Sequence, residues 1–289
     1  MHPAPSIILF TTLSGTGFGL LAWLGLDVPA PRGWVAFVFF LIAFGLACGG
    51  LISSTFHLGH PERALKAFTQ WRSSWLSREA FLAVLALSAM GLYALGLVFF
   101  GERWRLFGIL GAGLALLTVF ATSMIYMQMR TVPRWNHWSP PALFLGYAAA
   151  GGALLSGNVG AALVLLPLLG LVQIVAWIDG DRREAGSDST IATATGLGDR
   201  GAVRSFEAPH TGDNYLTKEM VYQVGRKHRK KLRIVSVILA AALPSLLLIL
   251  SFSHLLAAMA VISHLAGAYV SRWLFFAEAK HVVGLYYGN

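Results

Sequence analysis

Long apolar runs without charge constrain the fold of this chain more than any other feature. Eight stretches contain no Asp, Glu, Lys or Arg, and they lie at about 6–26, 34–56, 80–100, 106–127, 141–157, 159–178, 234–252 and 255–271. A helix of about 20 apolar residues crosses the ~30 Å hydrocarbon layer with all its backbone hydrogen bonds made internally. The sequence therefore predicts an all-α polytopic membrane protein, a bundle of eight transmembrane helices in a single integral-membrane domain over residues 1–289.

Composition supports this reading and excludes several chemistries. Only 12% of the residues are charged and the mean hydropathy is +0.64, whereas a soluble domain has roughly 25% charged residues. Cys48 is the only cysteine, which excludes an intrachain disulfide and an iron–sulfur cluster held by four thiolates of this chain. The net charge of +9 indicates membrane orientation rather than nucleic-acid binding, because basic residues gather in cytoplasmic loops.

Lysine and arginine are distributed unequally between the two faces of the predicted bundle. The loops at 57–79, 128–140 and 179–233 and the C-terminal tail hold 19 of the 22 basic residues, and the opposite face holds 3. The basic face is expected to be cytoplasmic. This places the chain in the bacterial cytoplasmic (inner) membrane as a multi-pass protein, with both termini and the 57–79 and 179–233 loops in the cytoplasm.

The long loop at 179–233 is rich in Gly, Asp, Ser and Thr and shows no apolar periodicity. It cannot bury a core of its own, so we expect it to be mobile or ordered against something else. Its basic end, Gly225–Arg233, is a candidate for contact with anionic lipid and for docking a partner. Within the spans, the Gly15/Gly19 and Gly45/Gly49 pairs have the spacing that lets helix backbones approach closely.

The densest polar segment outside that loop joins the second and third spans, and it interleaves aromatic residues with titratable ones. A quinone requires such a mixture, since apolar walls hold its ring and groups that exchange protons near neutral pH serve its two oxygens. Interfacial anchoring by Trp and Arg is the competing interpretation. The segment contains Phe56, His57, His60, Glu62, Arg63, Lys66, Trp71, Arg72, Trp75, Arg78 and Glu79.

The histidines do not form a haem pair. Of the nine, only His264 lies in the middle of a span, and no other lies at matching depth. We therefore expect no haem and no other metal in this chain, and a hydrogen-bonded packing role for His264. Without haem or clusters the chain cannot carry electrons over distance, so any redox role needs a carrier in another subunit docked near the quinone.

Three segments are similar to one known family. The sequences F-H-L-G-H-P-E-R-A, R-S-S-W-L-S-R-E and R-W-L-F-F-A-E-A-K-H-V-V-G-L-Y-Y resemble the membrane anchor subunit of the DMSO reductase family, as does the eight-helix plan. The resemblance implies a complex of this haem-free anchor with a molybdopterin catalytic subunit and an iron–sulfur subunit. In such a complex the anchor is the quinone-reactive part of an oxidoreductase.

The same resemblance gives two residues a role. The family's quinone-site histidine matches His57, and its acidic residue at the entry to the third span matches Glu79. Both are expected to be catalytic in proton exchange with ubiquinone or menaquinone; the sequence does not decide between these quinones. Further quinone-binding residues are extrapolated from their proximity along the chain, namely His60, Arg63, Trp71, Trp75 and Arg78.

The orientation favours one reaction within the family. A cytoplasmic three-subunit form resembles sulfite dehydrogenase, which oxidises sulfite and passes electrons to quinone. The alternative is the anchor of a DMSO or related S/N-oxide reductase that oxidises quinol. Two other classes are less favoured, a purely structural tether and a transporter; transport of charged solutes would normally leave ionisable groups within the spans.

Overall fold

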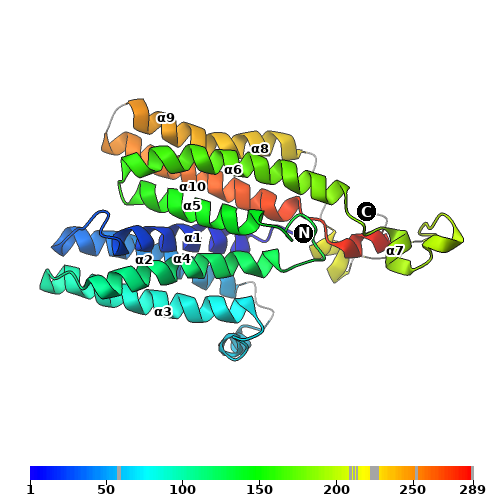
Figure 1. Ribbon diagram of the computed structural model, residues 1–289, viewed down its shortest axis with the longest axis horizontal. Helices are drawn as coiled ribbons and strands as arrows, with labels where there is room; N and C mark the ends of the chain where they lie inside the picture. The colour runs from blue at the N-terminus through cyan, green and yellow to red at the C-terminus, as the bar shows by residue number, and fades with distance from the viewer. Residues whose placement is uncertain are drawn as a thin grey trace.

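A computed structural model describes residues 1–56, 60–207, 210, 212, 214–221, 228–250 and 253–287. The described residues form long helices and no strand, as the apolar runs predict (Figure 1). Most of the long helical segments are single α-helices. Two are composite: α3 continues into the π-helical turn η2, and α8, η6 and α9 follow one another without a break. The bounds are α1 Pro5–Gly25, α2 Gly33–Thr55, α3 Trp75–Leu95, η2 Gly96–Phe100, α4 Arg105–Met127, α5 Ser139–Leu155, α6 Val159–Ala185, α8 Arg229–Val237, η6 Ile238–Ala242, α9 Leu243–Leu250 and α10 His254–Ala277.

Eight spans are predicted, and the described residues contain seven helices that are long and apolar enough to cross a membrane, with one shorter apolar helix at the position of the fifth predicted span. The shorter one is α5, with 17 residues. It packs against α1, α4, α6 and α10, so protein rather than lipid surrounds much of its length. A helix in that position does not need to match the full thickness of the hydrocarbon layer.

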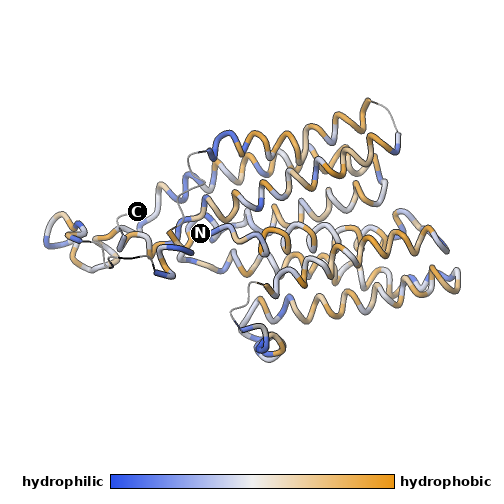
Figure 2. The backbone as a smooth tube through the Cα atoms, turned by 180° about the vertical axis from the view of Figure 1, so that it is seen from behind, coloured by the Kyte–Doolittle hydropathy of each residue, from blue (hydrophilic) through white to orange (hydrophobic). Residues whose placement is uncertain are grey.

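The bundle has two halves, α1–α4 and α5–α10, which meet where α1 packs against α5 and α10 (Figure 1). Large apolar side chains cover the outside, as expected of a lipid-facing surface, and the helices are apolar along most of their length (Figure 2). The buried positions are instead rich in Ala, Gly, Ser and Thr. Small residues at the interfaces let helices pack closely in a solvent where burying apolar area drives little association.

Close helix contacts occur mostly at glycines other than those expected. A methyl group added at Gly17 would clash with the backbone nitrogen of Ala47 in α2, and one added at Gly267 would clash with that of Ala240 in η6. Gly19 likewise packs on the backbone of Ala148 in α5. The expected contacts at Gly15, Gly45 and Gly49 are wrong, because an added methyl group at each would meet nothing within 4 Å.

Several helices extend beyond the uncharged runs. The third begins at Trp75 rather than at residue 80, and the last ends at Ala277 rather than at residue 271. The sixth continues to Ala185, and α8 begins at Arg229. The helix ends therefore carry charged residues that a search for uncharged stretches leaves out, including Arg78, Glu79, Asp181, Arg233 and Arg272.

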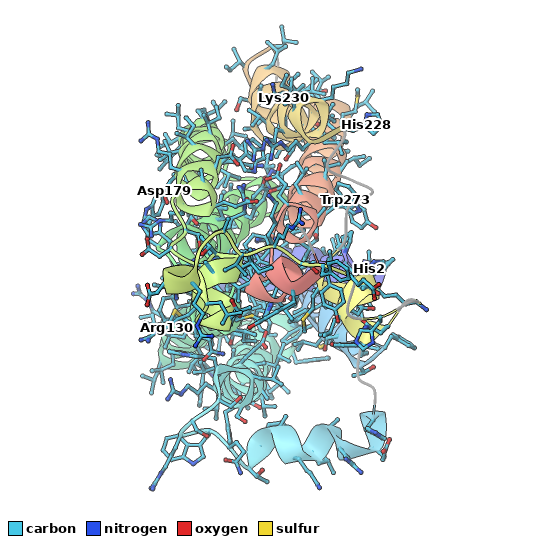
Figure 3. The ribbon with its side chains drawn as sticks, turned by 90° about the vertical axis from the view of Figure 1, so that its right-hand side faces the viewer. His2, Arg130, Asp179, His228, Lys230 and Trp273 are labelled. Atoms are coloured by element: carbon cyan, nitrogen blue, oxygen red, sulfur yellow. The ribbon has the colours of Figure 1, made fainter. Side chains whose placement is uncertain are left out.

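Both ends of the described chain and the loops at 60–74, 128–138 and 186–207 gather at one end of the bundle (Figure 1). Figure 3 looks onto this end, where Arg130, Asp179 and Lys230 lie around the rim. The described part of the long loop contacts the C-terminal segment here, since the Tyr286 hydroxyl donates to the Ala194 carbonyl at 2.9 Å. The short elements of this end are η1 Pro61–Phe68, α7 Ile191–Thr195, η3 Gly198–Arg200, η4 Leu216–Met220 and η7 Val282–Tyr287.

Candidate functional site

Two predicted quinone residues lie on or beside the short helix η1, outside the bundle. His60 and Arg63 are both exposed, with His60 Nδ1 2.9 Å and Arg63 Nε 4.0 Å from Glu62 Oε1. The helix runs across the end of the bundle beside α3, seen end-on in Figure 1 and lengthwise in Figure 3. Phe68 holds it there by packing edge-on against Phe81, with ring centroids 5.2 Å apart.

Arg78 organises the turn between η1 and α3. Its guanidinium donates to the carbonyls of Trp71 (3.0 Å) and Arg72 (2.7 Å) and lies over the Trp75 ring at 4.3 Å. Ser74 starts the helix by accepting a hydrogen bond from the Ser77 amide at 3.4 Å, as an N-cap residue does. Three predicted residues, Trp71, Trp75 and Arg78, are thus brought together into one polar and aromatic lid.

Glu79 points the other way, into the bundle. It lies in the first turns of α3 with 4% of its surface exposed. Its Oε1 lies 2.5 Å from Oγ1 of Thr122 in α4, and no Lys, Arg or His nitrogen of the described residues lies within 4.0 Å of the carboxylate. Thr122 Oγ1 is also 3.0 Å from the Thr118 carbonyl. Its single hydrogen can serve one of these acceptors at a time, so when it is donated to the Thr118 carbonyl, a protonated Glu79 can donate its own hydrogen to Thr122 Oγ1.

His57, the other predicted catalytic residue, lies outside the described residues. Among the rest, no hydrogen bond or ion pair joins Glu79 to His60 or Arg63. The predicted cluster therefore consists of three parts: exposed residues at η1, the lid around Arg78, and the buried Glu79 beneath it. Trp75 joins the second part to α4, because its ring packs edge-on against Phe120 with centroids 6.0 Å apart.

An aromatic cluster that the sequence analysis did not identify lies one helical turn further along α4. Tyr126 is four residues from Thr122, on the same helix face. Its ring packs against those of Phe144 and Phe275, with centroids 5.6 and 5.3 Å apart. Arg272 of α10 stacks on the Phe144 ring of this cluster, with its Cζ 3.6 Å from the centroid. Arg272 is thus inside a span and not in the cytoplasmic tail, where the apolar runs placed it.

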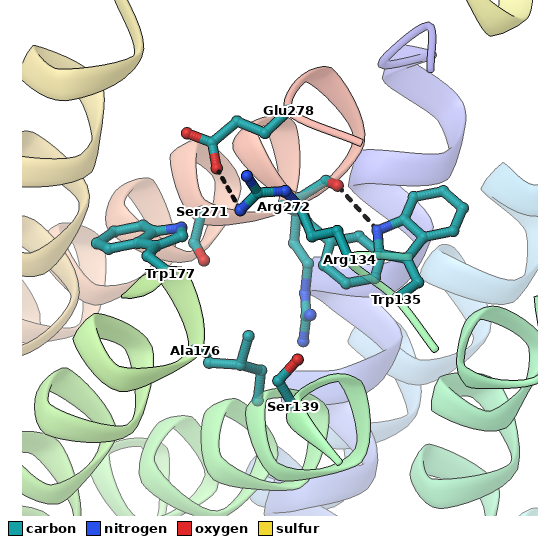
Figure 4. Close-up of a pocket in the computed structure, with 10 residues that line it drawn as sticks. Arg134, Trp135, Ser139, Ala176, Trp177, Ser271, Arg272 and Glu278 are labelled. Carbon is teal, nitrogen blue, oxygen red and sulfur yellow. Dashed lines mark hydrogen bonds and ion pairs between the residues drawn. The ribbon is translucent and has the colours of Figure 1, made fainter. Parts of the chain in front are cut away.

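The same end of the bundle contains a network of paired charges. Arg134, in the loop before α5, contacts Asp181, Glu184 and Glu278 at 2.5, 2.8 and 3.5 Å. Figure 4 marks its contact with Glu278. Arg233 contacts Asp181 and Glu278, each at 2.7 Å, and Lys280 contacts Glu184 at 2.7 Å. The network joins one loop to α6, α8 and the end of α10, and its members are Arg134, Asp181, Glu184, Arg233, Glu278 and Lys280.

Arg134 is the centre of this network, and its environment fixes its charge. Burial disfavours the guanidinium charge, but Asp181, Glu278 and Glu184 outweigh that effect and raise the pKa of Arg134 above its ordinary value. Arg233 is taken up by the same network, so it faces inward and not toward lipid headgroups. Of the basic cluster expected to contact lipid, residues 225–227 lie outside the described residues, Arg229 is half-buried, and Lys230 and Lys231 are exposed.

The second half of the bundle has a buried polar core. Tyr147 donates to Gln173 Oε1, and Gln173 Nε2 donates to the hydroxyls of Ser236 (2.9 Å) and Ser271 (3.0 Å). His264 Nδ1 lies 2.7 Å from the Ala240 carbonyl, which can only accept, so Nδ1 carries the proton. These contacts agree with the packing role expected for His264.

The sequence contained a signal for some of the charged residues that the sequence analysis did not identify. Arg272, Glu278 and Lys280 all belong to the C-terminal segment that carries the family resemblance. That segment thus contains charged residues that meet other helices. No sequence signal singles out Thr122, because hydroxyl residues are common in these spans.

The fold and its charged end define a class of protein, a polytopic helical membrane subunit that presents one ordered polar face. Comparison then gives the family. The model of the DMSO reductase anchor subunit (DmsC) matches residues 1–288, so the chain belongs to that family and is a membrane anchor subunit of an oxidoreductase complex.

One relative is similar to the chain over nearly its whole length. The chain is 33% identical to a sulfite dehydrogenase subunit of Allochromatium vinosum, in an alignment that covers 99% of each chain. No solved structure matches. Membership of the anchor family implies partner subunits that carry the catalytic and iron–sulfur cofactors, and a membrane in which the anchor resides.

Proposed function

We propose that this subunit exchanges electrons between a docked iron–sulfur subunit and membrane quinone, next to Glu79. One observation carries the proposal. Glu79 is a carboxyl buried within the helix bundle whose only partner among the described residues is the Thr122 hydroxyl. A structural carboxylate at this depth would be expected to have a cation. A carboxyl without one is free to take up and release a proton.

The residues around Glu79 fit a quinone in their chemistry. The Trp75 and Phe120 rings, which pack on each other one turn before Glu79 and two residues before Thr122, are proposed as an aromatic wall, and the turn held by Arg78 joins η1 to α3. When bound, a quinone accepts two electrons and two protons to become quinol. His60, Arg63 and Trp71 are proposed to line the approach to this site, and the family motif adds His57 in the segment that precedes η1.

Within this site the chain's own residues handle protons. Glu79 Oε1 is proposed to donate a proton toward the lid and to be reprotonated through the polar loops at the same end of the bundle. Thr122 holds the carboxyl in place from α4. The protein contributes proton exchange and positioning, and the electrons come from the partner subunit.

The partner subunits are proposed to dock at the end of the bundle where both termini lie. The excess of basic residues there, 19 against 3, supports a cytoplasmic location for that end in the bacterial inner membrane. The whole chain then forms one integral-membrane domain, with its long loop part of the docking surface rather than free.

The proposed direction is sulfite oxidation with reduction of quinone. The similarity to a sulfite dehydrogenase subunit and the cytoplasmic orientation both support it. The anchor of a DMSO or S/N-oxide reductase, which would oxidise quinol, is the second candidate, and the matching family description supports it. A twin-arginine export signal on the partner catalytic subunit would favour the second candidate.

The test is Glu79→Gln in the purified complex, which keeps the shape and removes the titratable proton. Turnover with a quinone analogue should fall at least tenfold, because general acid–base groups contribute ~10²–10⁴-fold. Dye-linked activity of the catalytic subunit should be unchanged. His57→Ala should give the same pattern.

Glu102→Gln is the matched control, since Glu102 is an exposed carboxylate at the opposite end of the bundle. It should leave both activities intact. Full quinone turnover in Glu79→Gln would refute the site and would favour a structural tether.

A further inference from the structure

A small cavity lies between the start of α5, the α4–α5 loop, α6 and the end of α10. Its volume is about 30 Å³, and its lining includes Ser139, Trp177, Ser271 and Arg272 (Figure 4). That is room for about one water molecule or one monatomic ion. A quinone ring is far too large for this cavity, so it is separate from the site proposed beside Glu79.

Arg272 enters this cavity as a buried cation. Its side chain points from α10 toward Ser139 (Figure 4), and only 2% of the residue is exposed. No carboxylate of the described residues lies within 4.0 Å of its guanidinium, and its Nε has no hydrogen-bond partner among them. The rings of Phe144 and Tyr147, 3.6 and 5.2 Å away, offer cation–π contacts, which offset only part of the cost of burying a charge.

The neighbouring network cannot supply the missing charge. It contains three cations and three carboxylates, so it is already neutral. Glu278, a carboxylate at the edge of the cavity, is engaged by Arg233 and Arg134. Arg272 cannot neutralise itself either, because an arginine does not lose its proton in proteins.

Other donors converge on the same space. Neither the Ser139 hydroxyl nor the Trp177 indole nitrogen hydrogen-bonds to any described residue, and both residues line the cavity. A water molecule would accept some of these hydrogens but leave the positive charge unbalanced. Burying an unpaired charge costs far more than burying a paired one.

We propose that this cavity binds one monatomic anion, chloride under ordinary conditions, held by the Arg272 guanidinium and the Ser139 hydroxyl. The site lies at the polar end of the bundle, so the ion reaches it from solution without crossing the apolar interior. Bound there, it joins the start of α5 to α10 beside the charged network. It stabilises the anchor and takes no part in electron transfer.

The first experiment measures anion-dependent stability of the purified, intact complex. Chloride or bromide is added against gluconate at constant ionic strength, and the anchor remaining in solution after heating is followed by immunoblot. A ligand at about a hundred times its Kd should raise the midpoint by roughly 5 °C, in a saturable manner. Arg272→Gln should abolish the dependence, and Arg183→Gln, an arginine paired with Asp179 at the surface, should retain it.

The second experiment counts the ion directly with radioactive chloride. Wild type and Arg183→Gln should bind one more chloride per complex than Arg272→Gln. If Arg272→Gln does not assemble, Ser139→Ala tests the same site, with the expected chloride midpoint about tenfold higher. Stability independent of chloride and bromide, equal chloride binding in wild type and Arg272→Gln, or an unchanged midpoint in Ser139→Ala would each overturn the proposal.

Discussion

The charged network around Arg134 and the buried carboxyl of Glu79 lie at the same end of this bundle and differ in one respect. In the network around Arg134, every charged side chain has an opposite charge within 4.0 Å, and the closest contact is 2.5 Å. Glu79 has a single hydroxyl partner in the part of the chain that the structure describes. Both groups are conspicuous as ionisable residues in a membrane protein, where such residues usually mark function.

This difference separates the residues that join helix ends from the residue that can take part in proton transfer. A network with three positive and three negative charges keeps its protonation state, so it suits the joining of helix ends and not proton transfer. A lone carboxyl can change its protonation state without breaking an ion pair. Charge compensation, more than burial, therefore distinguishes the residues that hold this fold from those we propose to act in it.

The largest effect is expected for the charged network, which we interpret as structural. Arg134→Gln leaves Asp181, Glu184 and Glu278 without their shared cation, and breaking a buried pair costs about 3–5 kcal/mol. Less anchor should accumulate in the membrane, and the thermal midpoint of the complex should fall. Turnover per assembled complex should stay within about twofold.

Arg130→Gln is the control, because Arg130 is exposed in the same loop (Figure 3) and should be neutral. If the Arg134 variant assembled normally but lost quinone turnover, the network would belong to the chemistry and the comparison would fail.

A smaller effect is expected at Glu79, the residue that we propose to exchange protons. Thr122→Val keeps the side-chain shape but removes the hydroxyl that contacts Glu79. Quinone turnover should fall about tenfold, because a hydrogen bond to a charged group contributes about 1.5–3 kcal/mol. The thermal midpoint should change less than in Arg134→Gln. Thr118→Val, one turn away with its hydroxyl bonded to the Leu114 carbonyl, should leave turnover unchanged; equal losses in both variants would contradict the role of Thr122.

The smallest effect concerns pH at the edge of the network. Burial, together with the charged N-terminus, lowers the pKa of His281, and its Nδ1 accepts a hydrogen bond from the Val283 amide at 3.1 Å. The unfolded segment therefore takes up a proton more readily than the folded one. Stability of η7 should decline as the pH falls through about 6.5, by less than about 1 kcal/mol.

Protease cleavage within residues 282–287 should accordingly be faster at pH 6 than at pH 8, after correction for the protease's own pH dependence. In His281→Gln this difference should disappear. A difference of the same size in the Gln variant would assign the effect to another group.

The sequence predicted the helices well, because the length and polarity of a span are local properties. It also pointed to Glu79, but through a family motif rather than through any property of the residue in isolation. The ion pairs could not be predicted in the same way. Arg134 and Glu278 are far apart in sequence, and only the packing of α6, α8 and α10 brings their partners together.

The positions of the helix ends were the main error of the sequence-based prediction. The search for uncharged runs ended each span at its first charged residue, so Glu79 and Arg272 were assigned to loops although both lie inside helices. The glycine spacing predicted helix contacts at the wrong glycines for a related reason. Gly15 and Gly17 both lie on α1, but only Gly17 lies against α2, and the sequence does not say which helix face meets a neighbour.

The central position of α1 has a consequence for biosynthesis. It precedes the other described helices in the chain, yet it is packed against α2, α4, α5 and α10, two of which emerge from the ribosome much later. Three of its hydroxyl residues, Thr11, Ser14 and Thr16, donate to carbonyls of their own helix. Because these hydroxyls are satisfied before any neighbour arrives, α1 can wait alone in lipid until the rest of the chain has been inserted around it.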